Sequence, residues 1–229
     1  MAANDLLGGL YPFLNEQGAL PARLDAELLE SVRQKAEDSL AVTQAFFRSH
    51  AEQVVASAKA IADLYRRDGR LFMMGNGGSS CDAAHIAVEF LHPVTTGRPA
   101  LPAANLAADV AMLMAIGNNV GIDHIFVRPL IAQARAGDGL IGVTTSGNSP
   151  NLLRAFEKAK EIGMTTIALS GGDDGSVARS PAVDHCLVVE TDSIHRIQEC
   201  HVAIYHILWD LVHTLLARDR CRAEQKGAP

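Results

Sequence analysis

A histidine and a glutamate lie four residues apart in the apolar segment 72–91, at His85 and Glu89. At this spacing the two side chains are neighbours on one face of a helix, and an imidazole and a carboxylate so placed suit one divalent metal ion. A hydrogen-bonded pair on a solvated face is the alternative. The rest of the helix is apolar, however, and a buried carboxylate is costly unless it is paired or bound to a metal. The pair therefore indicates a metal or acid–base site.

Histidines recur in a second apolar helix, predicted from about 194 to 217. This segment holds His195, His201, His206 and His213, together with Gln198. Any one of these histidines is more often a structural core residue than a ligand. Four in one helix exceed what core filling requires, so they have to be judged as a set and together with the other motifs of the chain.

Two loops rich in glycine and hydroxyl groups each join a strand to a helix. The first is GNGGSS at 75–80 and the second is TTSGNSP at 144–150. In the second loop Gly147 allows a tight turn, Ser149 suits an N-cap and Pro150 suits the first helical position. Free N–H groups at a helix start, with the helix dipole, make a seat for an anion. The hydroxyls belong to Thr144, Thr145, Ser146 and Ser149.

Four hydroxyls and no lysine in the second loop favour a phosphate monoester held by neutral donors. The alternative is that these are ordinary turn and cap residues, but a cap explains only Ser149. The first loop lacks the third glycine of the dinucleotide fingerprint and the Gly-Lys-Ser/Thr ending of a P-loop. Alone it indicates either a tight turn or a ligand cradle, and two such loops on one sheet edge support each other.

The elements that position these loops are short apolar runs alternating with amphipathic helices. Strands apolar throughout are buried on both faces, and alternation with helices implies parallel pairing. We therefore predict a doubly wound α/β three-layer sandwich with a five-stranded parallel sheet, preceded by N-terminal helices. Ligands of such sheets bind at the carboxyl ends of the strands. The strands are expected at 70–75, 101–107, 139–145, 165–171 and 184–190, and helices at 24–49, 51–67, 109–116, 123–136, 150–162 and 194–217, with another directly after the first glycine loop.

The composition fits a single globular domain and excludes several classes of protein. The chain has 229 residues, of which 48% are hydrophobic and 20% charged. A net charge of −6 argues against a broad basic surface for nucleic acid. The four cysteines form no C-x-x-C pair, so we expect free thiols in a reducing cytosol. We find no signal peptide and no apolar run of the roughly 18 residues that span a bilayer. We expect a cytoplasmic protein that does not bind membranes.

Four blocks of the sequence together resemble the phosphoheptose isomerases, which belong to the sugar-isomerase (SIS) domain group. They are GNGGSSCDAAHIAVEF, AIGNNVGIDHIF, TTSGNSPNLLRAFEKAKEIGMTTIALSG and RIQECHVAIYH, in the family's order. The resemblance implies an SIS domain at 31–217, an N-terminal extension at 1–30 and a C-terminal tail at 218–229. We expect the first 21 residues to form an irregular arm or a short helix with breaks. The family is generally a homotetramer with a zinc ion in a site built at subunit contacts.

The family's functional positions match residues of this chain one by one. Its sugar-phosphate loop matches Asn76, Gly77 and Gly78, and its phosphate turn matches Thr144, Thr145, Ser146 and Ser149. A substrate-contact pair matches Asn118 and Asn119. The metal-site residues match His85, Glu89, Gln198 and His206, and Gln198 is expected to contact the substrate as well.

The resemblance implies that the protein interconverts sedoheptulose 7-phosphate and heptose 7-phosphate for lipopolysaccharide or related glycans. The reaction moves a proton between C1 and C2 through an enediol, which requires a base at carbon and a second group at oxygen. Glu89 is the expected base and His206 the second group. Zinc would polarise the carbonyl.

Three positions depart from the family pattern. Asn119 and His195 each replace an aspartate, and Pro93 lies where an arginine is usual. These changes concern the sugar end of the pocket and leave open an isomerase for another sugar phosphate. A regulatory or replication-initiator-binding SIS protein that binds a sugar phosphate is the other alternative. The relatives that bind the initiator lack the glutamate of the His–Glu pair, so Glu89 favours an enzyme.

Overall fold

The computed structural model describes the backbone of residues 24–173 and 175–227. The prediction for the first 21 residues lies outside this part of the chain. The chain divides into two compact units, Met1–Asp38 and Ser39–Pro229. In the first unit, the described residues belong to a helix. The second unit contains the sheet and all the motifs discussed above.

A five-stranded parallel sheet lies at the centre of the second unit, in the order β2-β1-β3-β4-β5. The predicted α/β fold class is therefore confirmed. Every residue of β1 and β3 is buried, as their apolar runs predicted. The strand β2 is shorter than predicted and only half-buried. The strands are β1 (Leu71–Gly75), β2 (Ala103–Asn105), β3 (Gly139–Val143), β4 (Thr165–Gly171) and β5 (His185–Val189).

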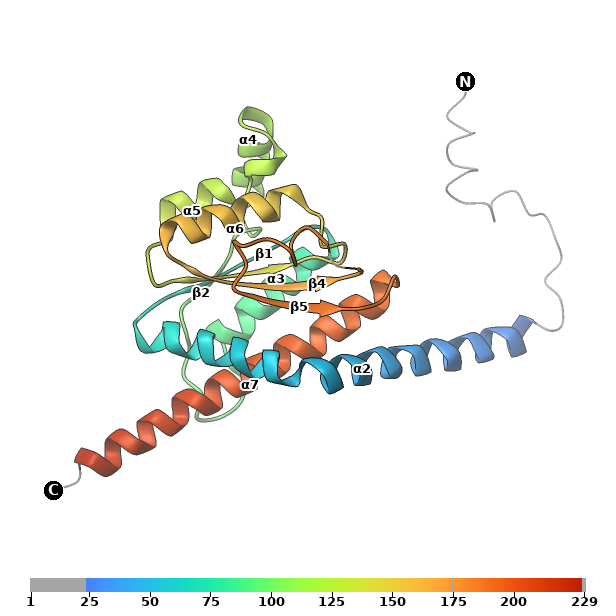
Figure 1. The fold of residues 1–229 in the computed structure, drawn as a ribbon, viewed down its shortest axis with the longest axis horizontal. Coiled ribbons are helices and arrows are strands. Elements are labelled where there is room, and N and C mark those ends of the chain that lie inside the picture. Colours follow the sequence, from blue (N-terminus) through green and yellow to red (C-terminus); the bar gives the residue numbers. More distant parts are fainter. Residues whose placement is uncertain (1–23, 174, 228–229) are drawn as a thin grey trace. The chain divides into compact units, whose positions relative to one another are not determined.

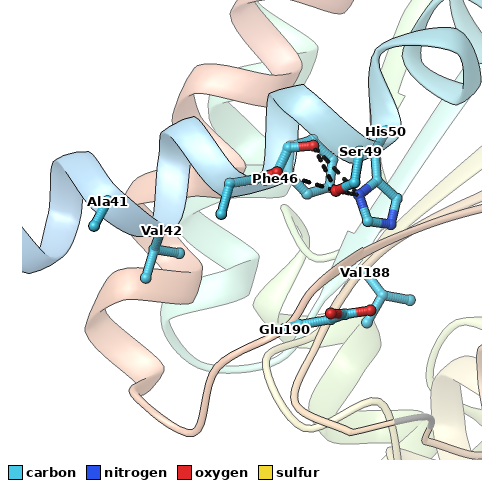
Figure 2. A pocket seen from close by; sticks show the side chains of 8 residues that line it. Ala41, Val42, Phe46, Ser49, His50, Val188 and Glu190 are labelled. Carbon is cyan, nitrogen blue, oxygen red and sulfur yellow. Dashed lines mark hydrogen bonds between the residues drawn. The ribbon is translucent and has the colours of Figure 1, made fainter.

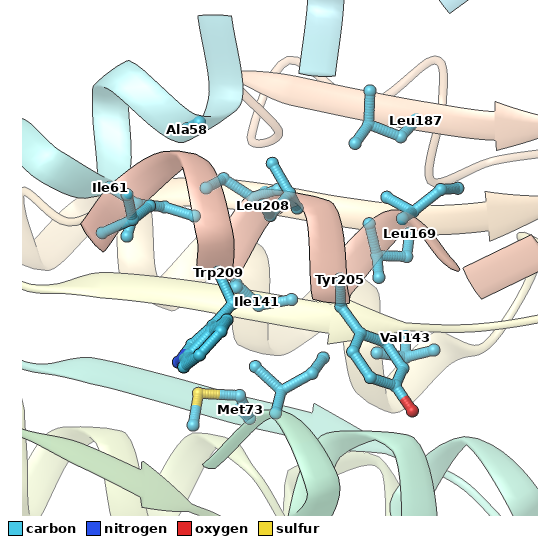
Figure 3. Close-up of a cluster of buried hydrophobic side chains, with 14 of the residues drawn as sticks. Ala58, Ile61, Met73, Ile141, Val143, Leu169, Leu187, Tyr205, Leu208 and Trp209 are labelled. Atoms are coloured by element: carbon cyan, nitrogen blue, oxygen red, sulfur yellow. The ribbon is translucent and has the colours of Figure 1, made fainter. Parts of the chain in front are cut away.

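Helices cover both faces of the sheet, as Figure 1 shows. Alternate strand residues point to opposite faces, so each face has its own core. On one face Met73, Ile141 and Leu169 pack with residues of α2, α3 and α7 (Figure 3). On the other face Phe72 and Leu140 pack with α4, α5 and α6. The helices are α2 (Leu24–Arg66), α3 (Gly78–Leu91), α4 (Val110–Asn119), α5 (Val127–Gln133), α6 (Pro150–Ile162) and α7 (Ile194–Gly227), with a 3₁₀ turn η2 (Ile122–His124).

The largest differences between the helices and the predictions occur at three places. The two helices predicted at 24–49 and 51–67 are one helix, α2, because no glycine or proline interrupts the chain between Leu24 and Arg66. The helix predicted at 123–136 is split into η2 and α5. The last helix, α7, continues to Gly227 instead of ending at 217.

The helix α7 contains a segment, Ile194–Asp219, that is long and apolar enough to cross a membrane by length and composition alone. Its apolar side packs instead into the core that it shares with α2 and α3, through residues that include Ile204, Leu208 and Val212. A core helix can share this composition with a membrane span, because its buried side packs against apolar residues.

Candidate active site

Three polar side chains from α3 and α7 converge on one point. They are His85 and Glu89 of α3 and His206 of α7, and their ligand atoms all lie within 4.8 Å of one another. The Nε2 atom of His85 is 3.3 Å from Oε1 of Glu89, and the rings of His85 and His206 lie edge to face with centroids 5.0 Å apart. The structure therefore brings together residues 117 positions apart at the closest, counting from Glu89 to His206.

The three groups fit a metal ion. Zinc holds nitrogen and carboxylate oxygen ligands at about 2.0–2.2 Å, which places tetrahedral ligand atoms roughly 3.5 Å apart. The observed separations reach that value with small side-chain movements. The side chains of His85 and Glu89 are 42% and 20% exposed, so the site is open to a ligand from solvent.

Two further residues, Tyr205 and Asp82, lie next to this cluster. The Tyr205 hydroxyl lies 2.8 Å from Nδ1 of His85. Asp82, one turn before His85 on α3, is buried, and its Oδ2 has no hydrogen-bond partner among the residues that the structure describes. Burial raises the pKa of Asp82, while the neighbouring His85 acts in the opposite direction. Sequence spacing did not single out either residue.

The first glycine loop is fixed to the start of α6 by a pair of amides. Asn76 donates to Oδ1 of Asn151 at 2.9 Å, and Asn151 donates in return to Oδ1 of Asn76 at 2.8 Å. Gly77 has φ 53°, a left-handed conformation that favours glycine. Gly78 lies so close to Gln198 that a Cβ atom there would overlap the side-chain amide. The loop therefore contacts both α6 and α7, and Asn151 is a contributor that the sequence prediction missed.

The hydroxyl turn at 144–149 follows β3 on the same sheet edge. Ser149 occupies the N-cap position of α6 and Pro150 begins the helix, as predicted, but the Ser149 side chain makes no capping hydrogen bond. Its Oγ lies 3.4 Å from Oγ1 of the buried Thr144 instead. Ser149 therefore holds the predicted N-cap position, but its hydroxyl lies near Thr144 and does not cap the helix.

The loop that contains Ser176 and Val177 forms hydrogen bonds with this turn. The Oδ1 atom of Asn148 accepts hydrogen bonds from both N and Oγ of Ser176, at 2.9 and 3.0 Å. The amide of Val177 donates to the carbonyl oxygen of Gly147 at 2.8 Å. Thr145 is half-buried and Ser146 is exposed within the turn. The backbone of the turn is thus held before any ligand arrives.

The other residues singled out in the sequence lie at the end of α4 and in the first turns of α7. Asn118 and Asn119 are exposed at the end of α4, where Asn118 donates to Oδ1 of Asn119 at 3.0 Å. His195 is exposed in the first turn of α7. The amide of Gln198 lies against Gly78 at the start of α3.

A cavity of about 290 Å³ lies elsewhere, between α2 and the end of β5 (Figure 2). It is lined mainly by apolar side chains of α2, with His50 and Glu190 as its ionisable groups. It contains no residue of the predicted site. The predicted site residues therefore do not line this cavity.

Comparison with known proteins identifies relatives over most of the chain. Residues 36–171 match the family model described as SIS domain. The phosphoheptose isomerase of Chlorobaculum tepidum is 43% identical over 175 residues, which are 75% of this chain and 83% of that protein. The phosphoheptose isomerase of Aquifex aeolicus is 39% identical over 189 residues, 82% of this chain and 98% of that protein.

Solved structures of similar fold include proteins of the same name as these sequence relatives. A phosphoheptose isomerase from Francisella tularensis superposes with a TM-score of 0.77 at 32% identity, covering 81% of this chain and 98% of that one. The enzyme of the same name from Neisseria gonorrhoeae gives a TM-score of 0.76 at 35% identity, covering 82% and 99%.

Proposed function

The chain belongs to the phosphoheptose isomerase family of SIS-domain proteins, and from this premise we propose that it interconverts sedoheptulose 7-phosphate and a heptose 7-phosphate. It is an aldose–ketose isomerase that uses acid–base chemistry. The observation that carries the assignment of roles is the convergence of His85, Glu89 and His206 from two separate helices. The product would supply heptose for lipopolysaccharide or a related glycan.

Glu89 is the proposed base. Its carboxylate is 20% exposed, so it is accessible to the C1–C2 end of a sugar while partly shielded from water. It removes the proton from one carbon and returns it to the other, and a base in reach of both carbons suffices for this step. His206 is the proposed second group and transfers the proton between O1 and O2.

The donor set supports a zinc ion as the proposed cofactor. His85, Glu89 and His206 would hold it, and Gln198, whose amide lies against Gly78, is the proposed fourth ligand. When bound, zinc would polarise the carbonyl group and stabilise the negative charge that develops on oxygen. His85 and His206 would orient the ion, and Glu89 would combine the roles of ligand and base.

The phosphate end of the substrate is proposed to bind at the hydroxyl turn and the first glycine loop. Thr144, Thr145, Ser146 and Ser149 supply neutral donors beside the start of α6, where the helix dipole favours an anion. Asn76, Gly77 and Gly78 form the opposite side, because the Asn76–Asn151 amide pair joins the two segments. Asn118 and Asn119 are the proposed contacts of the sugar hydroxyls.

We further propose a homotetramer that acts in the cytoplasm. The exposed apolar side chains of two helices support self-association, because several large apolar side chains exposed close together often mark an interface. On α2 they include Leu28, Leu29, Val32 and Leu40, and on or beside α4 they include Val110, Met112, Met114, Val120 and Ile122. Analytical ultracentrifugation tests the oligomeric state.

The decisive experiment is incubation of the purified protein with sedoheptulose 7-phosphate, with and without zinc, followed by product analysis. Replacing Glu89 by Gln should lower kcat by about 10²–10⁴-fold. Glu157→Gln, at an exposed position of α6, is the matched control and should leave kcat unchanged. No conversion under either metal condition would remove the assigned reaction. If the Glu89→Gln variant converts the substrate at the wild-type rate, Glu89 is not the base.

A further inference from the structure

Two aromatic residues of α7 match the spacing of the His–Glu pair on α3. Tyr205 and Trp209 are four residues apart, as are His85 and Glu89, and each contacts one member of the pair. The Tyr205 hydroxyl is 2.8 Å from Nδ1 of His85. The Trp209 indole N–H donates to the carbonyl oxygen of Glu89, also at 2.8 Å. Figure 3 shows both rings extending from the same side of α7.

The Tyr205 ring packs against both histidines of the site. Its centroid is 5.2 Å from that of His85 and 4.8 Å from that of His206, with interplanar angles of 70° and 62°. These edge-to-face contacts limit rotation of the His85 ring. With Nδ1 at the Tyr205 hydroxyl, the other nitrogen, Nε2, is 3.3 Å from the Glu89 carboxylate. The contact therefore determines which nitrogen faces the cluster.

A hydroxyl serves this purpose better than a carbonyl group or an amine. It can donate to an unprotonated Nδ1 or accept from a protonated one, so it satisfies both tautomers of His85. The Tyr205 hydroxyl is therefore able to act in either sense.

The second contact explains why α7 is held in register with the end of α3. A helical carbonyl normally accepts from the amide four residues later, but the residue four after Glu89 is Pro93, which has no N–H. Trp209 supplies the missing donor. The guanidinium of Arg98 lies 4.2 Å from the centre of the Trp209 ring and is paired with Asp210. Together, these contacts of Trp209 and Asp210 fix the α7 backbone one turn beyond Tyr205.

We propose that Tyr205 is a positioning residue of this site, whose hydroxyl holds the His85 ring by Nδ1 and keeps Nε2 directed at Glu89 and His206. When His85 uses Nε2 as a metal ligand, its Nδ1 carries the proton and the Tyr205 oxygen accepts from it. Outer contacts of this type orient ligating histidines and contribute to metal affinity. The part of the inference that concerns zinc rests on the proposed function, whereas the orientation of His85 does not.

The test is Tyr205→Phe, which removes the hydroxyl and keeps the ring. In the metal-free protein, ¹⁵N NMR of the histidine side chains should show the Nδ1 resonance of His85 shifted by the substitution, because Nδ1 loses its hydrogen-bond partner. Zinc affinity, measured by competition with a chromophoric chelator, should fall by about 10–100-fold. Tyr65→Phe is the matched control, because the Tyr65 hydroxyl donates to Pro102 O at 3.3 Å in the core. It should change neither readout.

The outcomes separate this inference from the proposed function. If wild-type protein fails to bind zinc but the Nδ1 shift appears, the metal site is wrong and the positioning role stands. If Tyr205→Phe keeps the wild-type Nδ1 resonance and zinc affinity, the positioning role is wrong. A shift of both nitrogens with a lower melting temperature would indicate repacking of the core, and it would also overturn the proposal.

Discussion

Replacing Gly78 by alanine should lower activity without lowering stability. A Cβ atom built at this position has Gln198 atoms as its three nearest neighbours, overlapping Nε2 and lying 3.4 Å from Cδ and 3.7 Å from Oε1. Gly78 is the first residue of α3 and is not among the glycines with positive φ, so alanine suits its backbone. The new methyl group must therefore displace the end of one flexible side chain.

The size of the effect follows from this displacement. Ordinary contacts between heavy atoms lie at about 3.5–4.0 Å, so the Gln198 amide must move by roughly 1 Å. A misplacement of about 1 Å in a site can cost about 10²-fold in rate. The unfolding free energy should stay the same or rise by up to about 1 kcal/mol, because alanine favours a helix more than glycine does.

The assay is a double-mutant cycle on kcat/KM with Gly78→Ala, Gln198→Ala and the two combined, with urea unfolding of each protein. If Gly78→Ala acts through Gln198, the combined variant should be no worse than Gln198→Ala. Gly77→Ala is the control: it has φ 53° and no atom within 4 Å of the added Cβ, so it should lose about 1–2 kcal/mol of stability and leave Gln198 in place. Full activity of Gly78→Ala, or additive losses in the cycle, would refute the reasoning.

Two further predictions concern the phosphate turn and the core. Ser149→Ala should raise KM for the sugar phosphate by about 10–100-fold, since a hydrogen bond to a charged group contributes about 1.5–3 kcal/mol. A lower melting temperature with an unchanged KM would instead show that Ser149 only stabilises the start of the helix. Burial lowers the pKa of His201 from 6.5 to about 4, although its bond to Ser170 O acts in the opposite direction. The unfolded chain therefore binds the proton first, so this contribution to stability is complete above pH 6.5 and declines by roughly 3 kcal/mol as the pH falls to about 4. Urea unfolding at pH 7.5 and 5 measures the decline, and it should be smaller in His201→Gln; an equal decline in both proteins would contradict the assignment.

Local sequence pattern predicted the elements whose signal is local. The runs at β1 and β3 are apolar over their whole length, and both strands are fully buried where predicted. The division of the first helix was wrong because the weakening of the apolar pattern near residue 50 coincides with no helix-breaking residue. The end of α7 was placed too early, since a helix needs no apolar face to continue through polar residues that have high helix propensity.

The candidate site was predictable where its residues lie on one element. The spacing of His85 and Glu89 and the hydroxyls of the turn are visible in the sequence. The contacts of Tyr205 with His85 and of Trp209 with Glu89 join residues 120 positions apart, and only packing of α7 on α3 reveals them. Asn151 was missed for the same reason, because its partner Asn76 lies on the loop after another strand.

The three departures from the family pattern lie outside the convergence of His85, Glu89 and His206. Pro93 removes the amide that the Glu89 carbonyl would otherwise use, and Trp209 replaces it from the neighbouring helix, so this change is compensated inside the chain. Asn119 and His195 are exposed, where an amide and an imidazole would meet sugar hydroxyls instead of the reacting carbons. Neither substitution removes a group to which we assign proton transfer.

We therefore expect this isomerase to differ from its relatives in KM and in its preference among sugar phosphates, with kcat for its best substrate maintained. Asn119→Asp should then alter the ratio of kcat/KM values between sedoheptulose 7-phosphate and shorter ketose phosphates, and a ratio equal to that of the wild type would show that position 119 does not read the sugar.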